Sequence, residues 1–422
     1  MSGCFRFLQN ARRVENEMTV IVIGAGAAGL IAAGTAAKTA DRVVLIEKND
    51  IIGKKLLITG KGRCNITNVA EIEDMIPMYP HNGKFLYSAL YSFTNEDIVA
   101  LLEKYGVQTK IERGGRIFPI SDRAGDVVGA LKRYAMQPNT KHIHAAVREI
   151  LTEDGHVVGV RTDKGKIDGE RVIICTGGKS YPNTGSTGDG YRFAEQTGHC
   201  VTALKPSLVP IVTEEKWVRE LMGLSLKNVS ISAYDRKNKR VYEDFGEMLF
   251  THFGISGPIV LSMSAHLKQG GAYRLEVDLK PALSPEQLDA RLLRDFEKHG
   301  KKHLINSLDE LLPKAMIPVI ISLAGIEPHK PVCDLTRTER QALAETLKHV
   351  PLTFRAFRPI EEAIVTSGGV SVREINPSTM ESKRIQGLYF AGEVLDVDGY
   401  TGGYNLQAAF STGYLAGMSA AE

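Results

Sequence analysis

A glycine-rich turn near the start of the chain constrains its fold more than any other feature of the sequence. Residues 19–23 form a β-branched apolar run, typical of a buried parallel strand, and the Ala-rich residues 30–40 are typical of a helix. A second apolar run, residues 42–46, ends in an acid. Between the first strand and the helix stand three glycines in G-x-G-x-x-G spacing, Gly24, Gly26 and Gly29. This order predicts a βαβ unit that binds a dinucleotide.

Each part of this unit has a physical role in such a site. Gly24 permits the tight turn after the strand, Gly29 lets the helix pack closely, and Gly26 lets the backbone approach a pyrophosphate. Free N–H groups and the dipole at the helix start favour phosphate, and the acid can accept hydrogen bonds from ribose hydroxyls. The alternative is a glycine-rich structural turn. The expected binding residues are Gly24, Gly26, Ala27, Ala28, Gly29, Glu47 and Lys48.

A strand near the C-terminus ends in a second candidate binding element. The apolar residues 388–391 are followed by Gly392 and Glu393, at the strand end where open parallel sheets bind ligands. Glu393 can accept a hydrogen bond from a ribityl hydroxyl. In the alternative interpretation it is a solvated acid in an ordinary strand–turn–helix.

The loop after this strand leads into a final helix, expected over residues 404–417. Its first amides can face the N1/C2=O edge of a flavin, where negative charge develops on reduction. An NAD-only dehydrogenase needs no such distant element, whereas a cofactor with a ribityl arm does, so the pairing favours noncovalently bound FAD. The expected residues of this element are Gly392, Glu393, Gly403, Tyr404, Asn405 and Leu406.

A third glycine-rich turn follows the apolar residues 171–175. Its small residues let the chain cross the dinucleotide fold closely, and the expected set is Thr176, Gly177 and Gly178. Residues 140–175 are expected to form a meander of strands. Val147 in this meander is assigned to the adenine by analogy with the fold alone.

The composition limits the class of protein. The chain of 422 residues has 52 basic and 49 acidic residues and a net charge of +3, which argues against a nucleic-acid coat protein or a polybasic membrane-surface protein. Its five cysteines include no C-x-x-C pair, so no redox dithiol, zinc ribbon or other metal site is expected. The longest strongly apolar stretch, residues 316–326, is too short to span a bilayer. We expect a cytoplasmic protein with a flexible extension before Met18.

Several longer strings resemble a known family. Residues 53–68 read GKKLLITGKGRCNITN, residues 115–119 read GRIFP, residues 249–258 read LFTHFGISGP, and residues 401–407 read TGGYNLQ. These strings resemble the BaiN/YhiN-type family of NAD(P)/FAD-dependent oxidoreductases, which includes dehydro-bile-acid reductase-like and aminoacetone oxidase-like flavoproteins. Because the strings are spread along the sequence, the resemblance covers nearly all of the chain beyond residue 18.

The resemblance implies an α/β fold, with a glutathione-reductase-like FAD-binding Rossmann domain that carries an inserted β-plus-α domain. It also implies that polar residues of the first string lie along the cofactor, where Arg63 can neutralise phosphate. From the residues alone, Cys64 is better interpreted as a small packed side chain than as a redox group. The residues carried over from this string are Lys55, Gly62, Arg63, Cys64, Asn65, Thr67 and Asn68.

Changes of composition suggest where the domains begin and end. Residues 1–204 are expected to form the first part of the FAD-binding domain, and residues 350–422 its second part. Residues 205–349 are expected to form the inserted domain, β-rich over 205–280 and helical over 281–349.

Two side chains are candidates for catalysis. His252 stands in a glycine-rich loop, where an imidazole can act as acid or base near a flavin or simply hold its own loop. Arg116 is either an anion clamp or a surface ion-pair partner. No second G-x-G-x-x-G lies between a strand and a helix in mid-chain, so any NAD(P)H is expected to dock transiently over the flavin.

Together these features predict an FAD-dependent oxidoreductase, in which NAD(P)H drives reduction of an activated C=C bond or a similar small organic acceptor. An oxygen-using oxidase of small amines is the alternative. From another class, lysines of the inserted domain allow a flavin-containing protein that binds RNA or a partner, although nucleic acid is not the expected partner. These basic residues are Lys227, Lys237, Lys239, Arg240, Lys298, Lys301 and Lys302. Substrate, hydride donor and oligomeric state stay open.

Overall fold

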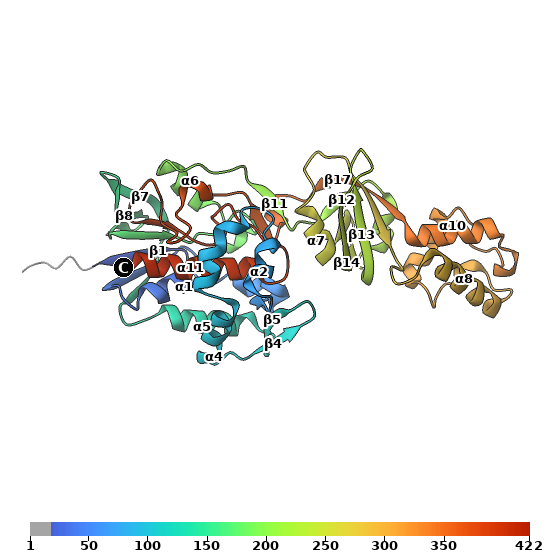
Figure 1. The fold of residues 1–422 in the computed structure, drawn as a ribbon, viewed down its shortest axis with the longest axis horizontal. Coiled ribbons are helices and arrows are strands. Elements are labelled where there is room, and N and C mark those ends of the chain that lie inside the picture. Colours follow the sequence, from blue (N-terminus) through green and yellow to red (C-terminus); the bar gives the residue numbers. More distant parts are fainter. Residues whose placement is uncertain (1–17) are drawn as a thin grey trace, which may run out of the picture. The chain divides into compact units, whose positions relative to one another are not determined.

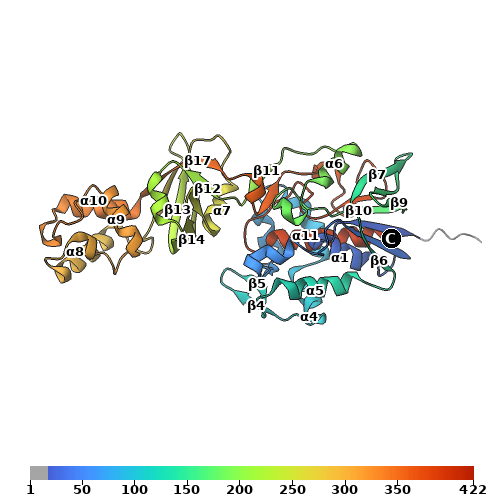
Figure 2. The same cartoon turned by 180° about the vertical axis from the view of Figure 1, so that it is seen from behind.

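A computed structural model describes residues 18–422, so the extension expected before Met18 lies outside the described residues. The chain divides into two compact units. Unit 1 contains the chain up to Leu204 together with Ser367–Glu422, and unit 2 is Lys205–Thr366. Figures 1 and 2 show the elements of both units from opposite sides.

Five parallel strands form the central sheet of unit 1. In spatial order they are β19 (Leu388–Phe390), β10 (Arg171–Ile174), β1 (Thr19–Ile23), β2 (Arg42–Glu47) and β6 (Thr140–His144). All five residues of the central strand β1 are buried, which explains its uninterrupted apolar run. The first and the last strands of the unit lie in one sheet, although most of the sequence separates them.

Three long helices of unit 1 pack together, and two of them approach each other without intervening side chains. They are α1 (Ala27–Ala36), α5 (Ala124–Ala135) and α11 (Tyr404–Ala420). A Cβ added to Gly413 would lie 2.4 Å from the carbonyl oxygen of Ala28, and one added to Gly417 would lie 2.4 Å from that of Ala32. Helices α1 and α11 therefore pack backbone against backbone. On α5, the hydroxyl of Tyr134 lies 2.9 Å from the Thr35 hydroxyl of α1.

Two small antiparallel sheets and several helices complete unit 1. One sheet has the order β3-β5-β4 and the other β7-β8-β9. The remaining strands are β3 (Thr67–Asn68), β4 (Thr109–Glu112), β5 (Arg116–Pro119), β7 (Val147–Glu153), β8 (His156–Thr162) and β9 (Gly165–Asp168). The remaining helices are α2 (Ile72–Met75), α3 (Tyr87–Ser92), α4 (Asn95–Lys104) and α6 (Asp189–Gln196).

The expected meander over residues 140–175 needs correction. Residues 140–144 form β6, which pairs in parallel with β2 rather than with the meander. The antiparallel meander contains only β7, β8 and β9, and the following β10 returns to the parallel sheet. Strand structure is interrupted at Ala145 and Ala146, because β6 continues the parallel sheet whereas β7 pairs with β8.

A closed barrel of six strands forms the core of unit 2. Its strands are β12 (Ile211–Thr213), β15 (Gly254–Ser256), β14 (Arg240–Phe250), β13 (Ser225–Tyr234), β16 (Arg274–Asp278) and β17 (Val350–Phe357). Helix α7 (Pro258–Ser264) follows β15, and β11 (Lys205–Ser207) pairs with β18 (Val365–Ser367).

The last barrel strand corrects the expected boundary at residue 350. β17 pairs with β12 on one side and with β16 on the other, so it closes the barrel. Residues 350–366 therefore belong to the inserted unit, and the chain returns to unit 1 at Ser367.

Three helices form the rest of unit 2 between β16 and β17. They are α8 (Pro285–His299), α9 (Ile317–Leu323) and α10 (Arg337–Lys348). Capping boxes start two of them, with Ser284 and Gln287 at α8 and Thr336 and Glu339 at α10. Within residues 18–422, no helix is both long and apolar enough to cross a membrane.

The contact between α1 and α11 can be tested by adding one methyl group. Gly413→Ala forces a methyl against the Ala28 carbonyl, so we expect a loss of about 1–3 kcal/mol in unfolding free energy. Gly129→Ala on α5 is the control, because its new methyl meets only the end of the Arg133 side chain, at 3.5 Å. Removing a glycine from a helix interior lowers the entropy cost of folding, so we expect its unfolding free energy to rise by about 0.5–1 kcal/mol. Urea unfolding followed by circular dichroism measures both. Equal stability of the two variants would contradict the close packing.

Candidate functional site

The turn between β1 and α1 has two glycines that the fold requires and one that it does not. Gly24 has φ +98°, and a Cβ on it would lie 2.5 Å from the Cys175 carbonyl oxygen. A Cβ on Gly29 would lie 1.8 Å from the Gly24 carbonyl oxygen. A Cβ on Gly26 would meet no protein atom within 4 Å. Protein packing therefore explains Gly24 and Gly29, whereas the open side of Gly26 fits an approaching pyrophosphate.

Glu47 is buried beside this turn and its carboxylate is held in place. One oxygen accepts a hydrogen bond from the Ala25 N–H at 2.8 Å, and the other accepts from the backbone and side-chain N–H groups of Asn49, each at 2.8 Å. A carboxylate has about four acceptor positions, so capacity remains for ribose hydroxyls. The ammonium of Lys48 forms an ion pair with Asp189 at 2.5 Å and donates a hydrogen bond to the Thr187 hydroxyl, so both of these partners are protein groups.

A hydrogen-bonded triangle joins three distant parts of the sequence. The ammonium of Lys55 donates to the Ser180 hydroxyl and to the Glu393 carboxylate, both at 2.7 Å. Ser180, which follows the third glycine turn, donates to the other Glu393 oxygen at 3.1 Å. The strand-end acid is thus a fixed group rather than a solvated one, and Lys55 balances its charge.

The string around Thr67 packs against the loop that enters α11. The Thr67 hydroxyl donates to the Gln407 side chain at 2.7 Å, and the Asn68 amide donates to the Gly402 carbonyl at 3.1 Å. In the amide orientation that satisfies both groups, Asn65 accepts from the Gly403 N–H at 3.0 Å. These contacts bring the two glycine-rich ends of the chain together.

Gly403 has φ +106° and caps α11 at its N-terminus. A Cβ on it would lie 2.4 Å from the Thr67 backbone, so only glycine fits. The first turn of α11 contains no acidic residue to offset the helix dipole. The Asn405 side chain donates to the Gly399 carbonyl at 2.7 Å, which ties the loop to the helix, while Tyr404 and Leu406 are half-buried.

Arg63 is held by two carboxylates and an aromatic ring. Its guanidinium pairs with Glu112 and with Asp122 and stacks 4.3 Å from the Phe118 ring centre. The hydrogen bond to Glu112, followed by the one to Asp122, raises the pKa of Arg63. Two carboxylates balance this charge in the structure, and neutralisation of phosphate by Arg63 stays a prediction.

Cys64 next to it is buried, and burial raises the pKa of its thiol to about 12. The thiol therefore stays protonated near neutral pH, which agrees with a packed side chain and gives no thiolate for redox chemistry. Its φ of +63° places it in the turn after Gly62, whose φ is +83°.

The third glycine turn contributes a buried polar atom. The hydroxyl oxygen of Thr176 is buried without a hydrogen-bond partner among the described residues. Gly177 has φ +72°, and Gly178 is buried. Val147, at the start of β7, is also buried. The unpartnered hydroxyl, together with the open face of Gly26, fits a dinucleotide cofactor such as FAD along this edge of unit 1.

The two expected catalytic residues lie in different units. His252 is exposed, on the loop between β14 and β15 of unit 2, with its ring 4.9 Å from that of Phe253. Arg358 stacks on Phe253 and forms a bidentate pair with Glu362. Arg116 of unit 1 donates from Nε to the Arg113 carbonyl at 2.9 Å, which leaves its outer N–H groups for other acceptors.

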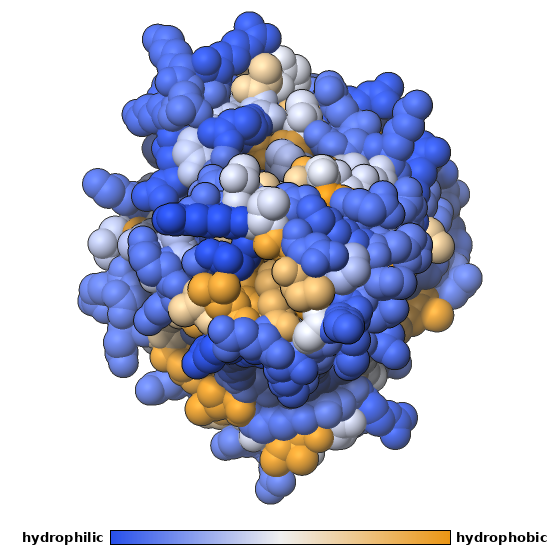
Figure 3. Space-filling model, turned by 90° about the vertical axis from the view of Figure 1, so that its right-hand side faces the viewer, coloured by the Kyte–Doolittle hydropathy of each residue, from blue (hydrophilic) through white to orange (hydrophobic). Residues whose placement is uncertain are grey.

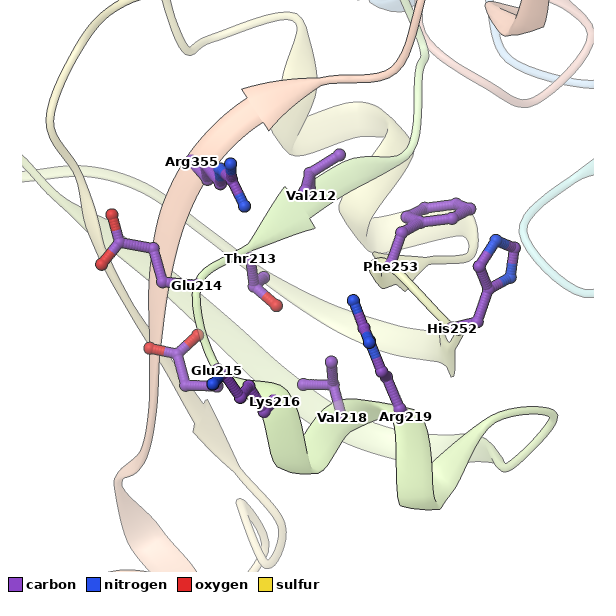
Figure 4. A pocket seen from close by; sticks show the side chains of 10 residues that line it. All are labelled: Val212, Thr213, Glu214, Glu215, Lys216, Val218, Arg219, His252, Phe253 and Arg355. Atoms are coloured by element: carbon purple, nitrogen blue, oxygen red, sulfur yellow. The ribbon is translucent and has the colours of Figure 1, made fainter.

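A cavity in unit 2 was not expected from the sequence. It has a volume of about 160 Å³, and His252 is one of its lining residues. Figure 4 shows the side chains that line it, which come from β12, the turn and short 3-10 helix (Lys216–Leu221) that follow β12, the β14–β15 loop and β17. No local sequence pattern predicts this cavity, because closure of the barrel brings its three lining segments together. The lining is Val212, Thr213, Glu214, Glu215, Lys216, Val218, Arg219, His252, Phe253 and Arg355.

A known family matches almost the whole of the described chain. Residues 18–419 match the family described as HI0933-like protein Rossmann domain. The chain belongs to this family.

Two curated relatives match over almost the full length. The 3-dehydro-bile acid delta(4,6)-reductase of Clostridium scindens is 34% identical, over 95% of this chain and 98% of the relative. The ribosomal RNA dihydrouridine synthase of Haemophilus influenzae is 33% identical, over 94% of this chain and 97% of the relative.

A solved structure shares the fold. The 3-ketosteroid-delta4-(5alpha)-dehydrogenase of Rhodococcus jostii RHA1 gives a TM-score of 0.52 with 15% identity and covers 99% of each chain. These findings confirm the expected resemblance, the Rossmann-type FAD-binding fold and the expected class, a flavoprotein oxidoreductase.

The open face of Gly26 allows a direct test of the phosphate turn. Gly26→Ala adds a methyl where no protein atom interferes, so we expect unchanged stability of the apoprotein and FAD affinity weakened at least about tenfold by steric exclusion of the pyrophosphate. Apoprotein titrated with FAD gives the dissociation constant. Gly129→Ala is the matched control and should bind FAD like wild type. Unaltered affinity in Gly26→Ala would remove this turn from the site.

Proposed function

We propose that this flavoprotein reduces a C=C bond conjugated with a carbonyl group, with NAD(P)H as the hydride donor. The observation that carries the proposal is that the two curated relatives share one bond change. A delta(4,6)-reductase of a 3-dehydro steroid and a dihydrouridine synthase both saturate a ring C=C that is conjugated with a carbonyl. The likeness extends over almost the whole of each chain.

The residues of unit 1 bind and orient the cofactor. In this proposal the Gly24–Gly29 turn and the first amides of α1 hold the pyrophosphate, and Glu47 holds the ribose. Glu393, held by Lys55, accepts a hydrogen bond from the ribityl arm, and the N-terminus of α11 stabilises negative charge on the flavin ring. When bound, FAD supplies the hydride chemistry.

His252 is proposed to donate the proton that the reaction requires. Hydride addition to a C=C conjugated with a carbonyl leaves negative charge on the acceptor, which must gain a proton at carbon. An exposed imidazole that lines a cavity can deliver it near neutral pH.

The acceptor is either a small molecule or a base in RNA, since one relative is named for a bile acid and the other for ribosomal RNA. The basic residues of unit 2 do not form a uniformly charged face. Lys298 pairs with Glu310 and Arg240 with Glu243. The surface in Figure 3 is mostly hydrophilic with small hydrophobic areas. Basic residues paired with acidic ones are typical of a solvated face. We therefore propose RNA only as a hydride acceptor, and not as a partner bound by a basic surface.

The first test mixes the anaerobic holoprotein with NADH or NADPH in a stopped-flow instrument. We expect rapid bleaching of the flavin absorbance with at least one donor, followed by reoxidation on addition of a 3-oxo-4,6-diene steroid or uridine-containing ribosomal RNA. Mass spectrometry should show that the acceptor gains two hydrogens. Absence of bleaching with both donors would contradict the proposal, and hydrogen peroxide formed from small amines would support the oxidase instead.

His252 can be tested separately from FAD binding. In His252→Asn we expect turnover with the accepted substrate to fall about 10²- to 10⁴-fold, because a positioned proton donor contributes that much. Flavin bleaching by NAD(P)H and FAD content should be retained. His329→Asn, another exposed imidazole of unit 2, is the control and should turn over normally. Undiminished turnover in His252→Asn would show that His252 is not the proton donor and serves only the structure of its loop.

A further inference from the structure

The cavity of unit 2 contains polar groups that the barrel does not use. Thr213 at the end of β12 is only 5% exposed, and its hydroxyl oxygen has no hydrogen-bond partner among the described residues. One carboxylate oxygen of Glu215 is likewise buried and unpartnered. A buried polar group left without a partner is unfavourable, because it has lost its hydrogen bonds to water. Thr213 and Glu215 both line the cavity, so a ligand with a hydrogen-bond donor for Glu215 and a partner for Thr213 would satisfy both groups.

Positive side chains converge on the same space. Arg219, Arg355 and Lys216 line the cavity, and no carboxylate among residues 18–422 forms an ion pair with any of them. In Figure 4, Arg219 and Arg355 extend toward Thr213 from different elements, and the carboxylate of Glu214 lies on the same side of Thr213 as Arg355. The neighbouring Arg358, in contrast, is neutralised by Glu362 at 2.6 Å.

The size and the donors of the cavity match an oxyanion. A volume of about 160 Å³ is several times the roughly 30 Å³ that a water molecule occupies in the liquid, so a phosphate or carboxylate group fits. Guanidinium groups bind both through paired N–H donors, and the Thr213 hydroxyl supplies a further donor. The buried oxygen of Glu215 can accept from a hydroxyl or an N–H of the same ligand.

We propose that this cavity binds an oxyanion carried by the acceptor, either a phosphodiester or a carboxylate. His252 lines the same cavity, so the anion and the proton donor act on one ligand. The assignment to the acceptor rests on the proposed function, whereas binding of the anion itself does not. The anion anchors the acceptor outside the bond that is reduced.

Binding can be measured without turnover. The holoprotein is titrated with inorganic phosphate by calorimetry, and the fluorescence of Trp217 gives a second readout, because it is the single tryptophan of the chain and its neighbours Lys216 and Val218 line the cavity. We expect Arg219→Gln and Arg355→Gln each to weaken phosphate binding about tenfold or more. Thr213→Val should weaken it severalfold. Arg236→Gln, an exposed arginine between β13 and β14, is the charge-matched control and should bind phosphate like wild type.

Two further ligands identify the source of the anion. The first ligand is a short uridine-containing RNA oligonucleotide. Tighter binding of this oligonucleotide than of phosphate supports a phosphodiester, provided that only the Arg219→Gln and Arg355→Gln variants lose that binding. Cholate, a steroid carboxylate, showing the same pattern supports a carboxylate. Failure of all three ligands to bind would overturn the site, and so would equal binding by wild type and by the double variant that combines Arg219→Gln with Arg355→Gln.

The outcomes separate this site from the proposed function. If the anions bind as expected but neither acceptor is reduced, the proposed function fails and the anion site stands. If an acceptor is reduced and the double variant keeps its KM, the assignment of the site to the acceptor fails and the reductase stands. A KM raised about tenfold or more, with flavin reduction by NAD(P)H unchanged, supports both.

Discussion

The contact on which unit 1 depends is the backbone-to-backbone packing of α1 against α11. Gly413 and Gly417 leave no room for a side chain between α11 and the carbonyls of Ala28 and Ala32. This closeness sets the final helix beside the first βαβ unit. It also places the loop at Gly403 against Thr67 and lets Lys55 reach Glu393 across 338 residues of sequence. A larger side chain at the helix contact would move all of these groups together.

The parts of the fold that follow from local periodicity could be predicted from the sequence. The buried strand β1, the glycine turn and α1 lie within a single stretch, and the roles of Gly24 and Gly29 follow from hard-sphere packing. The strand β17 could not be predicted in the same way. Its alternating pattern follows a helical stretch, and only its pairing with β12 and β16 assigns it to the barrel. Its neighbours are remote in sequence, and a local pattern contains no information about them.

The same distinction explains the predictions for site residues. Glu393 was identified because it ends a strand of the parallel sheet, where ligands bind. Arg63 was assigned to phosphate because its string resembles a cofactor-binding one, but nothing near it in sequence reveals that Glu112 and Asp122 return beside it. Thr213, Arg219 and Arg355 were missed for a related reason. They share a cavity only once the barrel closes, and each is an ordinary residue in its own segment.

The insertion of unit 2 between the halves of unit 1 imposes an order on biosynthesis. Unit 2 is one continuous stretch, so its barrel can close as soon as β17 has left the ribosome. The sheet of unit 1 must wait for β19, and the side of α1 that faces α11 stays uncovered until α11 emerges as the last helix of the chain. The dinucleotide-binding edge is therefore assembled last, although its phosphate turn is synthesised first. A ribosome that stops before residue 388 releases a finished barrel attached to a sheet that lacks its edge strand β19, and the apolar face of α1 that α11 would cover is a target for chaperones and proteases.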